Sequence, residues 1–374
     1  MWTGARRPVR RYAVVLAATL LLGIVLPAQA ALARPISSRD KATAAVETMM
    51  GFYDKESGRW APSDPWWQSG NALQTLLDYM AHTHSTPRSY LWALRNTVRL
   101  QREPLPWWPS GGGEFRADST DDTGWWALAM IRAYDLTHDP DYLAIAETDA
   151  AYIQGYWDGI CGGGVWWDIP GKTYKNAISN ELYIALLASL HNRIRGDTTY
   201  LHRAIQAWSW FTNSGMINSG HLVNDGLQTQ SGSCDSNLGT TWTYNQGVIL
   251  GGLAELYKGT HDRRYLTSAR HIADAVVAST DLSPGGILTE PCEGAGTCNA
   301  DQAAFKGIFA RNLADLDRVL PRHPYRGYLR RQAVSAYTHD RTGTDQYGLS
   351  WRGPFDGTSL GRQESAASLL IATL

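Results

Sequence analysis

The sequence predicts an all-α protein with an (α/α)6 barrel, a toroid of six helical hairpins. A Tyr-Leu pair recurs five times with a period of 52 to 65 residues, beginning at Tyr90, Tyr142, Tyr200, Tyr265 and Tyr328. Most pairs follow a polar turn, and each lies between two segments whose apolar residues have helical spacing. Strand signals are scarce. Each repeat is therefore predicted to be an αα-hairpin.

The predicted hairpins are clearest in the middle of the chain. Residues 125–136 and 142–153 form one, and residues 248–257 and 265–277 form another. One further helix is predicted at each end, over residues 41–53 and 363–374, which brings the helices to twelve. Both terminal helices are apolar on one face, so we expect them to pair and close the ring. The alternative is an open solenoid, which usually carries polar caps.

The first 30 residues are typical of a signal peptide, and one domain is expected over residues 31–374. Four arginines precede an apolar stretch and a small-residue cleavage site: Arg6, Arg7, Arg10, Arg11, then residues 12–26 and 28–30. Cleavage after Ala30 would make the protein secreted. An uncleaved anchor is the alternative, although the stretch is short for a bilayer span.

Charge and hydropathy exclude several classes of protein. Cleavage removes four arginines and no acidic residue, so the formal charge falls from -1 to -5. No basic face for nucleic acid is evident, and no later apolar run is long enough to span a membrane. We expect a monomer that binds no nucleic acid and is not stably inserted in a membrane.

Four cysteines in an exported chain favour disulfides, which can pair in three ways. They are Cys161, Cys234, Cys292 and Cys298. The short spacing of the last two favours a small closed loop, which leaves the first two as partners. A metal site is the alternative, but no Cys-x-x-Cys or His-Glu-x-x-His spacing supports it. We expect no metal and no cofactor.

The first helix of each predicted hairpin begins with a polar cluster, and a toroid gathers these clusters at one mouth. They comprise residues 68–71, 121–123, 176–180 and 244–246, Lys306, and residues 362–364. Polar groups that converge on a helix-lined cavity indicate a binding site. Lys306 is either a cation of that site or a solvated charge, and it is not predicted to be catalytic.

Tryptophan is unusually abundant, with 16 Trp against 6 Phe. Eight of the Trp residues form doublets that begin at Trp66, Trp107, Trp125 and Trp166. An indole ring is a flat apolar surface with a polar edge, suited to stacking on a sugar. The alternative for any single Trp is core packing, but we expect at least one member of the doublets to bind sugar.

The doublet Asp121-Asp122 is the main catalytic candidate, at the head of an apolar helical run. A helix N-terminus favours one carboxylate as an anion, and the like charge beside it favours protonation of the other. Acid/base and nucleophilic chemistry at a glycosidic bond needs that asymmetry. The alternative role is helix capping.

The chain resembles glycoside hydrolase family 76, the endo-α-1,6-mannanases and their fungal cell-wall relatives. Six motifs in order carry the resemblance: residues 66–69, 121–126, 161–167, 175–180, 242–247 and 305–309. The resemblance implies an (α/α)6 fold and cleavage of α-1,6-linked mannan with retention of anomeric configuration. It also implies Asp121 as nucleophile, Asp122 as general acid/base and no metal. Glu181 departs from the pattern, because a small residue is expected there, and this puts the neighbouring subsite in doubt.

Twelve residues are predicted to bind the glycan, which would be an α-mannan polysaccharide or a mannose-containing glycolipid. They are Trp67, Gln68, Asn71, Trp125, Trp126, Trp166, Trp167, Asn176, Asn180, Tyr244, Asn245 and Gln246. The alternative role is helix capping for five of them: Asn176, Asn180, Tyr244, Asn245 and Gln246.

The sequence also contains partial signals of other functions. A terpene-cyclase-like barrel needs Asp-Asp-x-x-Asp, but Trp125 occupies the last position. Residues 357–361 formally match a serine-hydrolase nucleophile elbow, without a credible strand before them. A cell-wall transglycosidase and a non-catalytic glycan-binding protein stay open. The sequence ends in its last helix without a hydrophobic tail, which favours a secreted hydrolase over an anchored transglycosidase.

Overall fold

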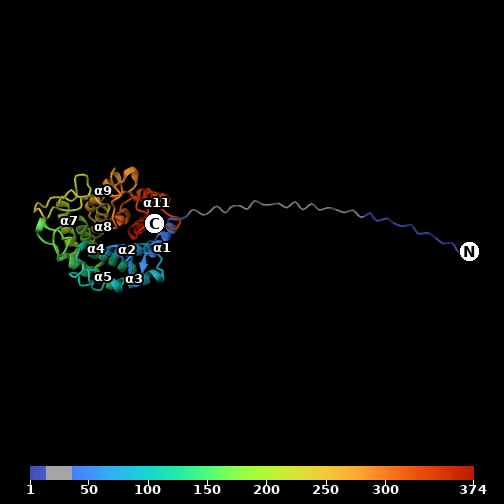
Figure 1. The fold of residues 1–374 in the computed structure, drawn as a ribbon, viewed down its shortest axis with the longest axis horizontal. Helices are drawn as coiled ribbons and strands as arrows, with labels where there is room; N and C mark the ends of the chain where they lie inside the picture. Colours follow the sequence, from blue (N-terminus) through green and yellow to red (C-terminus); the bar gives the residue numbers. More distant parts are fainter. Residues whose placement is uncertain (14–35) are drawn as a thin grey trace. The chain divides into compact units, whose positions relative to one another are not determined.

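The computed structural model describes residues 1–13 and 36–374 (Figure 1). The chain divides into two units, residues 1–36 and 37–374. Residues 1–13 contain no helix or strand. Nearly all of the predicted apolar stretch, and the cleavage site after it, lie outside the described residues. Within those residues, no helix is both long and apolar enough to cross a membrane.

Six helices form the inner ring of the second unit. They are α2 (Trp66–Thr83), α4 (Thr120–Thr137), α6 (Ala177–Arg193), α8 (Thr243–Thr260), α10 (Gln302–Val319) and α12 (Leu360–Ile371). Each inner helix packs against the next, and α12 returns to α2. The ring is therefore closed, and the predicted (α/α)6 barrel is confirmed.

Six more helices lie outside this ring, at the periphery of the ribbon in Figure 1. They are α1 (Ser38–Met50), α3 (Arg88–Gln101), α5 (Pro140–Gln154), α7 (Thr199–Asn213), α9 (Arg263–Ala278) and α11 (Arg326–His339). The two ends of the domain form the sixth hairpin, because α1 packs against α12. Across that contact the amide of Gln363 donates to the carbonyl of Ala45 at 3.0 Å.

The inner and outer helices differ in how many of their residues are buried. In α6 every residue from Ala177 to Leu190 is buried, because both faces contact protein. In α9 the buried residues recur at helical spacing along one face, as expected of an outer helix: Tyr265, Leu266, Ala269, Ile272, Ala273 and Val276. The hydrophobic core thus lies mainly between the inner and outer rings.

Glycines let the inner helices approach closely. A Cβ added at Gly247 in α8 would lie 2.5 Å from the Cα of Phe309, and one at Gly307 in α10 would lie 2.4 Å from the Cα of Ser365. Both distances are shorter than any ordinary contact. Backbone packs directly against backbone here, which brings the first turns of the inner helices together at one mouth.

Three inner helices end in the same way, with Thr-His. The residue after the helix is His84, His138 or His261, each in the left-handed conformation. The preceding threonine hydroxyl donates to the carbonyl four residues back at 2.7 Å in all three helices. These ends correspond to polar turns of the sequence repeat.

Helix boundaries differ from the predicted ranges by five residues at the starts of α4 and α8, and by three residues at both terminal helices. The first helix starts at Ser38, since Ser37 and Asp40 form a capping box, and it stops at Met50. The chain then forms a short hairpin of β1 (Tyr53–Asp54) and β2 (Arg59–Trp60). The last helix starts at Leu360, three residues before the predicted position, since Ser359 caps it. Two 3-10 turns complete the elements, η1 (Ile160–Gly162) and η2 (Pro284–Gly286).

Candidate active site

A cavity of about 700 Å³ opens where several inner helices begin. Its walls come from the starts of α2, α4, α8 and α10 and from the loops between them. Eight aromatic side chains line it: Trp67, Trp108, Trp125, Trp167, Tyr174, Trp242, Tyr244 and Phe305. Six carboxylates line it as well: Asp118, Asp121, Asp122, Asp168, Asp225 and Asp301. The described lining contains no Lys, Arg or His.

The aspartate doublet lies in the first turn of α4, half-buried against this cavity. Asp121 accepts hydrogen bonds at both carboxylate oxygens. The backbone N–H of Asp122 donates to Oδ1 at 2.9 Å, and the indole Nε1 of Trp167 donates to Oδ2 at 3.0 Å. The N-cap position itself belongs to Ser119, which has extended backbone angles. The doublet is thus placed by a helix start but is not the cap.

The surroundings of the two carboxylates push both pKa values upward, to different extents. Burial raises the pKa of Asp121 to about 6, and the hydrogen bonds from Asp122 and Trp167 oppose that rise. Burial raises the pKa of Asp122 well above its usual value, and the charges of Asp121 and Asp301 raise it further. The proton of the pair is therefore held preferentially on Asp122, with Asp121 as the anion.

Aromatic rings form a continuous wall beside the doublet. Trp67 stacks on Trp125 with ring centroids 5.5 Å apart, and Trp125 stacks on Tyr244 at 6.4 Å. Tyr244 lies parallel to Phe305 at 3.7 Å. The indole of Trp67 also donates to Asp301 at 2.9 Å. Flat apolar faces next to polar acceptors match the two kinds of surface that a sugar presents.

The structure brings together five of the twelve predicted glycan-binding residues on the cavity wall. These are Trp67, Trp125, Trp167, Asn176 and Tyr244. Asn176 also caps α6, since its side chain accepts from the backbone N–H of Ser179 at 3.2 Å. The remaining seven do not line the cavity: Gln68, Asn71, Trp126, Trp166, Asn180, Asn245 and Gln246.

Three of those buried amides hold loops of the mouth in place. Asn180 accepts from the N–H of Val165 at 2.8 Å and donates to its carbonyl at 3.2 Å. Gln246 makes the same pair of bonds with Val223, both at 2.8 Å. Gln68 donates to the carbonyl of Ala300 at 2.7 Å. A primary amide matches the donor and acceptor of a peptide unit, so these residues position the walls instead of lining them.

The other two amides point into the barrel or its wall. The side chain of Asn71 accepts from Arg311, which also forms an ion pair with Glu364 at 3.4 Å. Asn245 is fully buried in α8, next to the half-buried Asp225. The polar clusters at the helix starts thus serve the interior of the domain as well as its cavity.

Two tryptophan doublets, those that begin at Trp125 and Trp166, each place one member in the protein interior and the other on the cavity wall. Trp126 is fully buried and stacks on Phe115 at 4.7 Å, so it belongs to the core. Trp166 is buried and donates to Asp158 at 2.7 Å. Their neighbours Trp125 and Trp167 face the cavity. Adjacent residues on a helix point about 100° apart, and adjacent residues in an extended segment point to opposite sides.

Much of the cavity wall was not predicted from the sequence. Trp108, Tyr174, Trp242 and Phe305 lie there, together with the acids Asp118, Asp168, Asp225 and Asp301. Trp242 and Phe305 belong to motifs that were recognised, and Trp108 to a recognised doublet. The four acids lie in loops or at a helix start, where an isolated Asp has no sequence signal beyond turn formation.

Three further residues have roles other than those considered from the sequence. Lys306 is fully buried and forms an ion pair with Glu293 at 2.6 Å, so it is neither a site cation nor a solvated charge. Glu181 is also fully buried and does not line the cavity, and burial raises its pKa well above the usual value. Ser359 accepts from the backbone N–H of Arg362 as the cap of α12, in a segment without a strand before it.

The cysteines form two disulfides, Cys161–Cys234 and Cys292–Cys298. The first joins η1 to the loop that carries Asp225, one of the cavity acids. The second closes a short loop before α10. Among the described residues, no group of three or more His, Cys, Asp or Glu side chains is arranged to hold a metal ion.

Comparison with known sequences places this chain among glycosidases. The sequence model of glycosyl hydrolase family 76 matches residues 37–374. The mannan endo-1,6-alpha-mannosidase DFG5 of Saccharomyces cerevisiae is 30% identical over 328 residues, which cover 82% of this chain and 70% of the yeast protein. The mannan endo-1,6-alpha-mannosidase DCW1 of the same yeast is 28% identical over 342 residues, covering 86% and 74%.

Solved structures show the same fold. The GH76A α-1,6-mannanase of Salegentibacter sp. HEL1_6 superposes with a TM-score of 0.80 at 24% identity, covering 90% of this chain and 99% of that chain. An inactive variant of that mannanase, with two consecutive aspartates replaced, has been solved with α-1,6-mannotriose. Dfg5 from Chaetomium thermophilum, in complex with glucosamine, has a TM-score of 0.79 at 25% identity and covers 90% of both chains.

Proposed function

We propose, since this chain belongs to glycosyl hydrolase family 76 and is a glycoside hydrolase, that it cleaves α-1,6-mannosidic bonds inside mannan chains. The two yeast relatives named above are mannan endo-1,6-alpha-mannosidases, and this chain aligns with each of them over most of its length. An open cavity of about 700 Å³ lined by aromatic rings has room for several sugar units and suits attack within a chain. The substrate is a polymer of α-mannan or the mannose chain of a glycolipid.

The first chemical step forms a covalent intermediate. A carboxylate oxygen of Asp121 attacks the anomeric carbon while Asp122 gives its proton to the departing glycosidic oxygen. The glycosidic C–O bond breaks, one half of the chain leaves with a new hydroxyl group, and the other half stays as an ester of Asp121.

The second step releases the remaining sugar. Asp122, now an anion, takes a proton from a water molecule, and the water oxygen attacks the anomeric carbon from the side that the leaving group vacated. The bond to Asp121 breaks and its carboxylate is restored. Two inversions at the same carbon give net retention of configuration.

One observation carries this assignment of roles, namely the unequal surroundings of the two carboxylates. Asp121 accepts two N–H donors that stabilise its anion, whereas the charges of Asp121 and Asp301 both favour the protonated form of Asp122. A nucleophile must be ionised and a general acid must carry its proton. The inactive double-aspartate variant of the Salegentibacter mannanase agrees with a catalytic pair of this kind.

The activity test uses the secreted domain without added metal on linear α-1,6-mannan. We expect short manno-oligosaccharides and new reducing ends, and the same assay on a mannose-containing glycolipid distinguishes the two substrate sources. Binding without new reducing ends would make the protein a glycan-binding module. Transfer of the chain to an added sugar acceptor in preference to water would make it a transglycosidase.

The roles of the two aspartates are tested with azide and an aryl α-1,6-mannobioside that has a good leaving group. With Asp122→Ala the ester still forms, and azide in place of water should give the α-azide. With Asp121→Ala azide must replace the nucleophile itself, and a single inversion should give the β-azide. The opposite pattern of products would reverse the two roles.

We also propose that the domain acts outside the cell as a monomer after removal of residues 1–30. Two disulfides fit an oxidising compartment. The mass of the protein recovered from the medium of expressing cells should correspond to a chain that begins at Ala31. A cell-bound product that retains its arginine-rich N-terminus would contradict export with cleavage.

A further inference from the structure

The Trp167 side chain lines the cavity and also forms a hydrogen bond with Asp121, the candidate nucleophile. Its indole Nε1 lies 3.0 Å from Oδ2 of Asp121. The other oxygen of the same carboxylate accepts the backbone N–H of Asp122 at 2.9 Å. Each oxygen of the carboxylate thus accepts an N–H donor, and the two hydrogen bonds together restrain its plane and direction.

The backbone around Trp167 is joined to the segment that starts α4. The N–H of Thr120 donates to the carbonyl of Trp167 at 2.9 Å, and its hydroxyl donates to the carbonyl of Trp166 at 2.7 Å. The N–H of Ile169 donates to the carbonyl of Asp118 at 2.9 Å. These bonds form a short antiparallel pairing, which fixes the position of Trp167 relative to the first turn of the helix.

The other edge of the backbone segment that carries Trp167 is hydrogen-bonded as well. Its own N–H donates to the carbonyl of Tyr174 at 2.8 Å. Oδ1 of Asp168 accepts the N–H of Thr173 at 2.8 Å and its hydroxyl at 2.9 Å, which closes the intervening loop. The indole is therefore presented to Asp121 by a segment that is bonded on both edges.

In the part of the cavity wall that the structure describes, no positively charged side chain could orient the Asp121 carboxylate in the same way. The titratable side chains that line the cavity together with Asp121 are acidic or phenolic: Asp118, Asp122, Asp168, Tyr174, Asp225, Tyr244 and Asp301. The described lining has no basic side chain. A cation would stabilise the ground-state anion strongly and so weaken it as a nucleophile, whereas a neutral N–H orients it with less stabilisation.

We propose that Trp167 is a positioning residue, whose indole N–H orients the Asp121 carboxylate for attack on the anomeric carbon. Its assignment from the sequence as a stacking surface for sugar is then secondary. The inference rests on the proposed role of Asp121 as nucleophile. The same hydrogen bond lowers the pKa of Asp121 against the effect of burial, so its loss has a signature in the pH profile.

The test is Trp167→Phe, which keeps an aromatic face and removes the donor. We expect the acidic limb of the kcat/KM profile to move to higher pH by about one unit, with kcat reduced about tenfold and KM changed less than threefold. Trp108→Phe is the matched control, because Trp108 also lines the cavity and its indole nitrogen has no hydrogen-bond partner. That variant should leave the limb in place.

An isosteric replacement separates the donor from the shape of the ring. Benzothienylalanine at position 167 exchanges only the N–H for sulfur, so it should reproduce the limb shift even if Trp167→Phe does not fold. A raised KM with an unmoved acidic limb in either variant would overturn the proposal and make Trp167 a stacking residue. Full turnover by Asp121→Asn would instead overturn the proposed function.

Discussion

The two ends of the barrel both carry carboxylates on or beside the inner helices, and their surroundings affect these carboxylates in opposite ways. At the open mouth six aspartates line a cavity without a single basic side chain in its described wall. At the other end the carboxylates are paired in two chains of ions. One runs Asp78, Arg132, Asp315, Arg318, and the other runs Asp135, Arg193, Glu255, Lys258.

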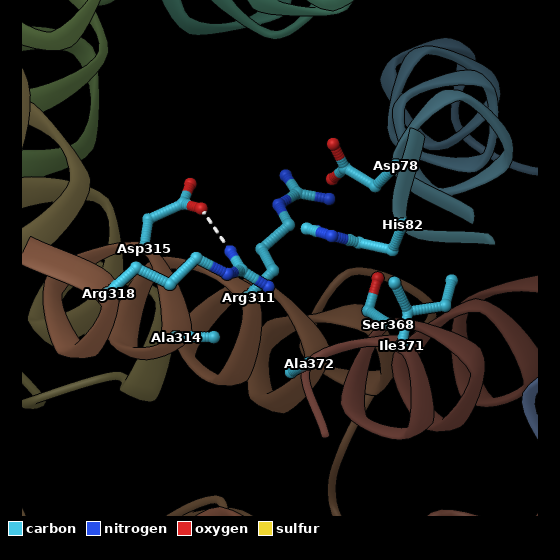
Figure 2. A pocket seen from close by; sticks show the side chains of 9 residues that line it. All are labelled: Asp78, His82, Arg311, Ala314, Asp315, Arg318, Ser368, Ile371 and Ala372. Atoms are coloured by element: carbon cyan, nitrogen blue, oxygen red, sulfur yellow. Dashed lines mark hydrogen bonds and ion pairs between the residues drawn. The ribbon is translucent and has the colours of Figure 1, made fainter. Parts of the chain in front are cut away.

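The paired end leaves little space. Figure 2 shows Asp78 and His82 facing Arg311, Asp315 and Arg318 across a pocket of about 10 Å³, enough for a water molecule. A second pocket between the inner helices at this end has about 30 Å³. Arginine side chains line both of these small pockets, whereas the cavity of about 700 Å³ lies at the other end of the barrel.

The pKa values of Asp315 and Asp121 depend more on neighbouring cations than on the helix dipole. Burial would raise the pKa of Asp315, but the charges of Arg132 and Arg318 lower it to about 2. This happens near a helix C-terminus, where the dipole disfavours an anion. The pKa of Asp121 is raised to about 6 at a helix N-terminus, where the dipole favours one. Placing or withholding a neighbouring cation therefore decides whether a buried carboxylate supports the fold or is available for chemistry.

The largest expected effect comes from removing the charge of Asp121. Asp121→Asn should lower kcat by on the order of 10⁴-fold or more, because no other group can form the ester. The free energy of unfolding should hardly change, since the amide keeps the volume. Urea unfolding and reducing-end assays on the same sample separate the two. If the Asp121→Asn variant is inactive because it is unfolded, the doublet has a structural role instead.

The converse change at the closed end should affect stability and spare the chemistry. Arg132→Met leaves Asp78 and Asp315 without their shared partner, and we expect a loss of about 3 kcal/mol in the free energy of unfolding. Below the unfolding transition kcat and the pH profile should match the parent. A shift in the pH profile would mean that the two ends of the barrel are electrostatically coupled.

The acid stability of the domain should depend on Asp315. Its pKa is lower in the folded state than in the unfolded state, so its stabilisation is present above pH 4 and is lost as the pH falls towards 2. The total is about 2 kcal/mol. Asp315→Asn should flatten the decline of stability over this pH range in urea titrations. An unchanged slope would assign the acid sensitivity to other carboxylates.

The smallest effect concerns the charge that faces Asp122 across the cavity. Asp301→Asn keeps an acceptor for Trp67 and removes a charge that raises the pKa of Asp122. The basic limb of the kcat/KM profile should move to lower pH by less than about one unit. Gln302→Lys should move it further in the same direction, because it gives this mouth a cation like those at the closed end. Added salt should reduce both shifts.

Much of the architecture was predictable because it depends on a repeated local pattern. The Tyr-Leu pairs fall in α3, α5, α7, α9 and α11, the outer helices of five hairpins. Ring closure followed from the apolar faces of the two terminal helices. The doublet Asp121-Asp122 was found at a helix start for the same reason, since helix signals and an acidic pair are both local.

The roles of the polar clusters were harder to predict, because an amide at a helix start has the same sequence whether it holds a loop or faces a ligand. Gln246 and Asn180 hold Val223 and Val165, each by two bonds to a residue at least 15 positions away. The aromatic doublets were ambiguous in the same way. Trp125 and Trp126 differ only in helical phase, and one faces the cavity while the other lies in the core.

The sequence by itself determined the twelve-helix toroid, the position of the acidic doublet at the start of an inner helix, and the family that the motifs indicate. These properties depend on periodicity and on residues close together in the chain. Only the tertiary structure decided which neighbours surround each carboxylate. Trp167 reaches Asp121 from 46 residues away, and Asp315 meets Arg132 across the barrel. Ionisation depends on distances between such groups, and only the closed ring sets those distances.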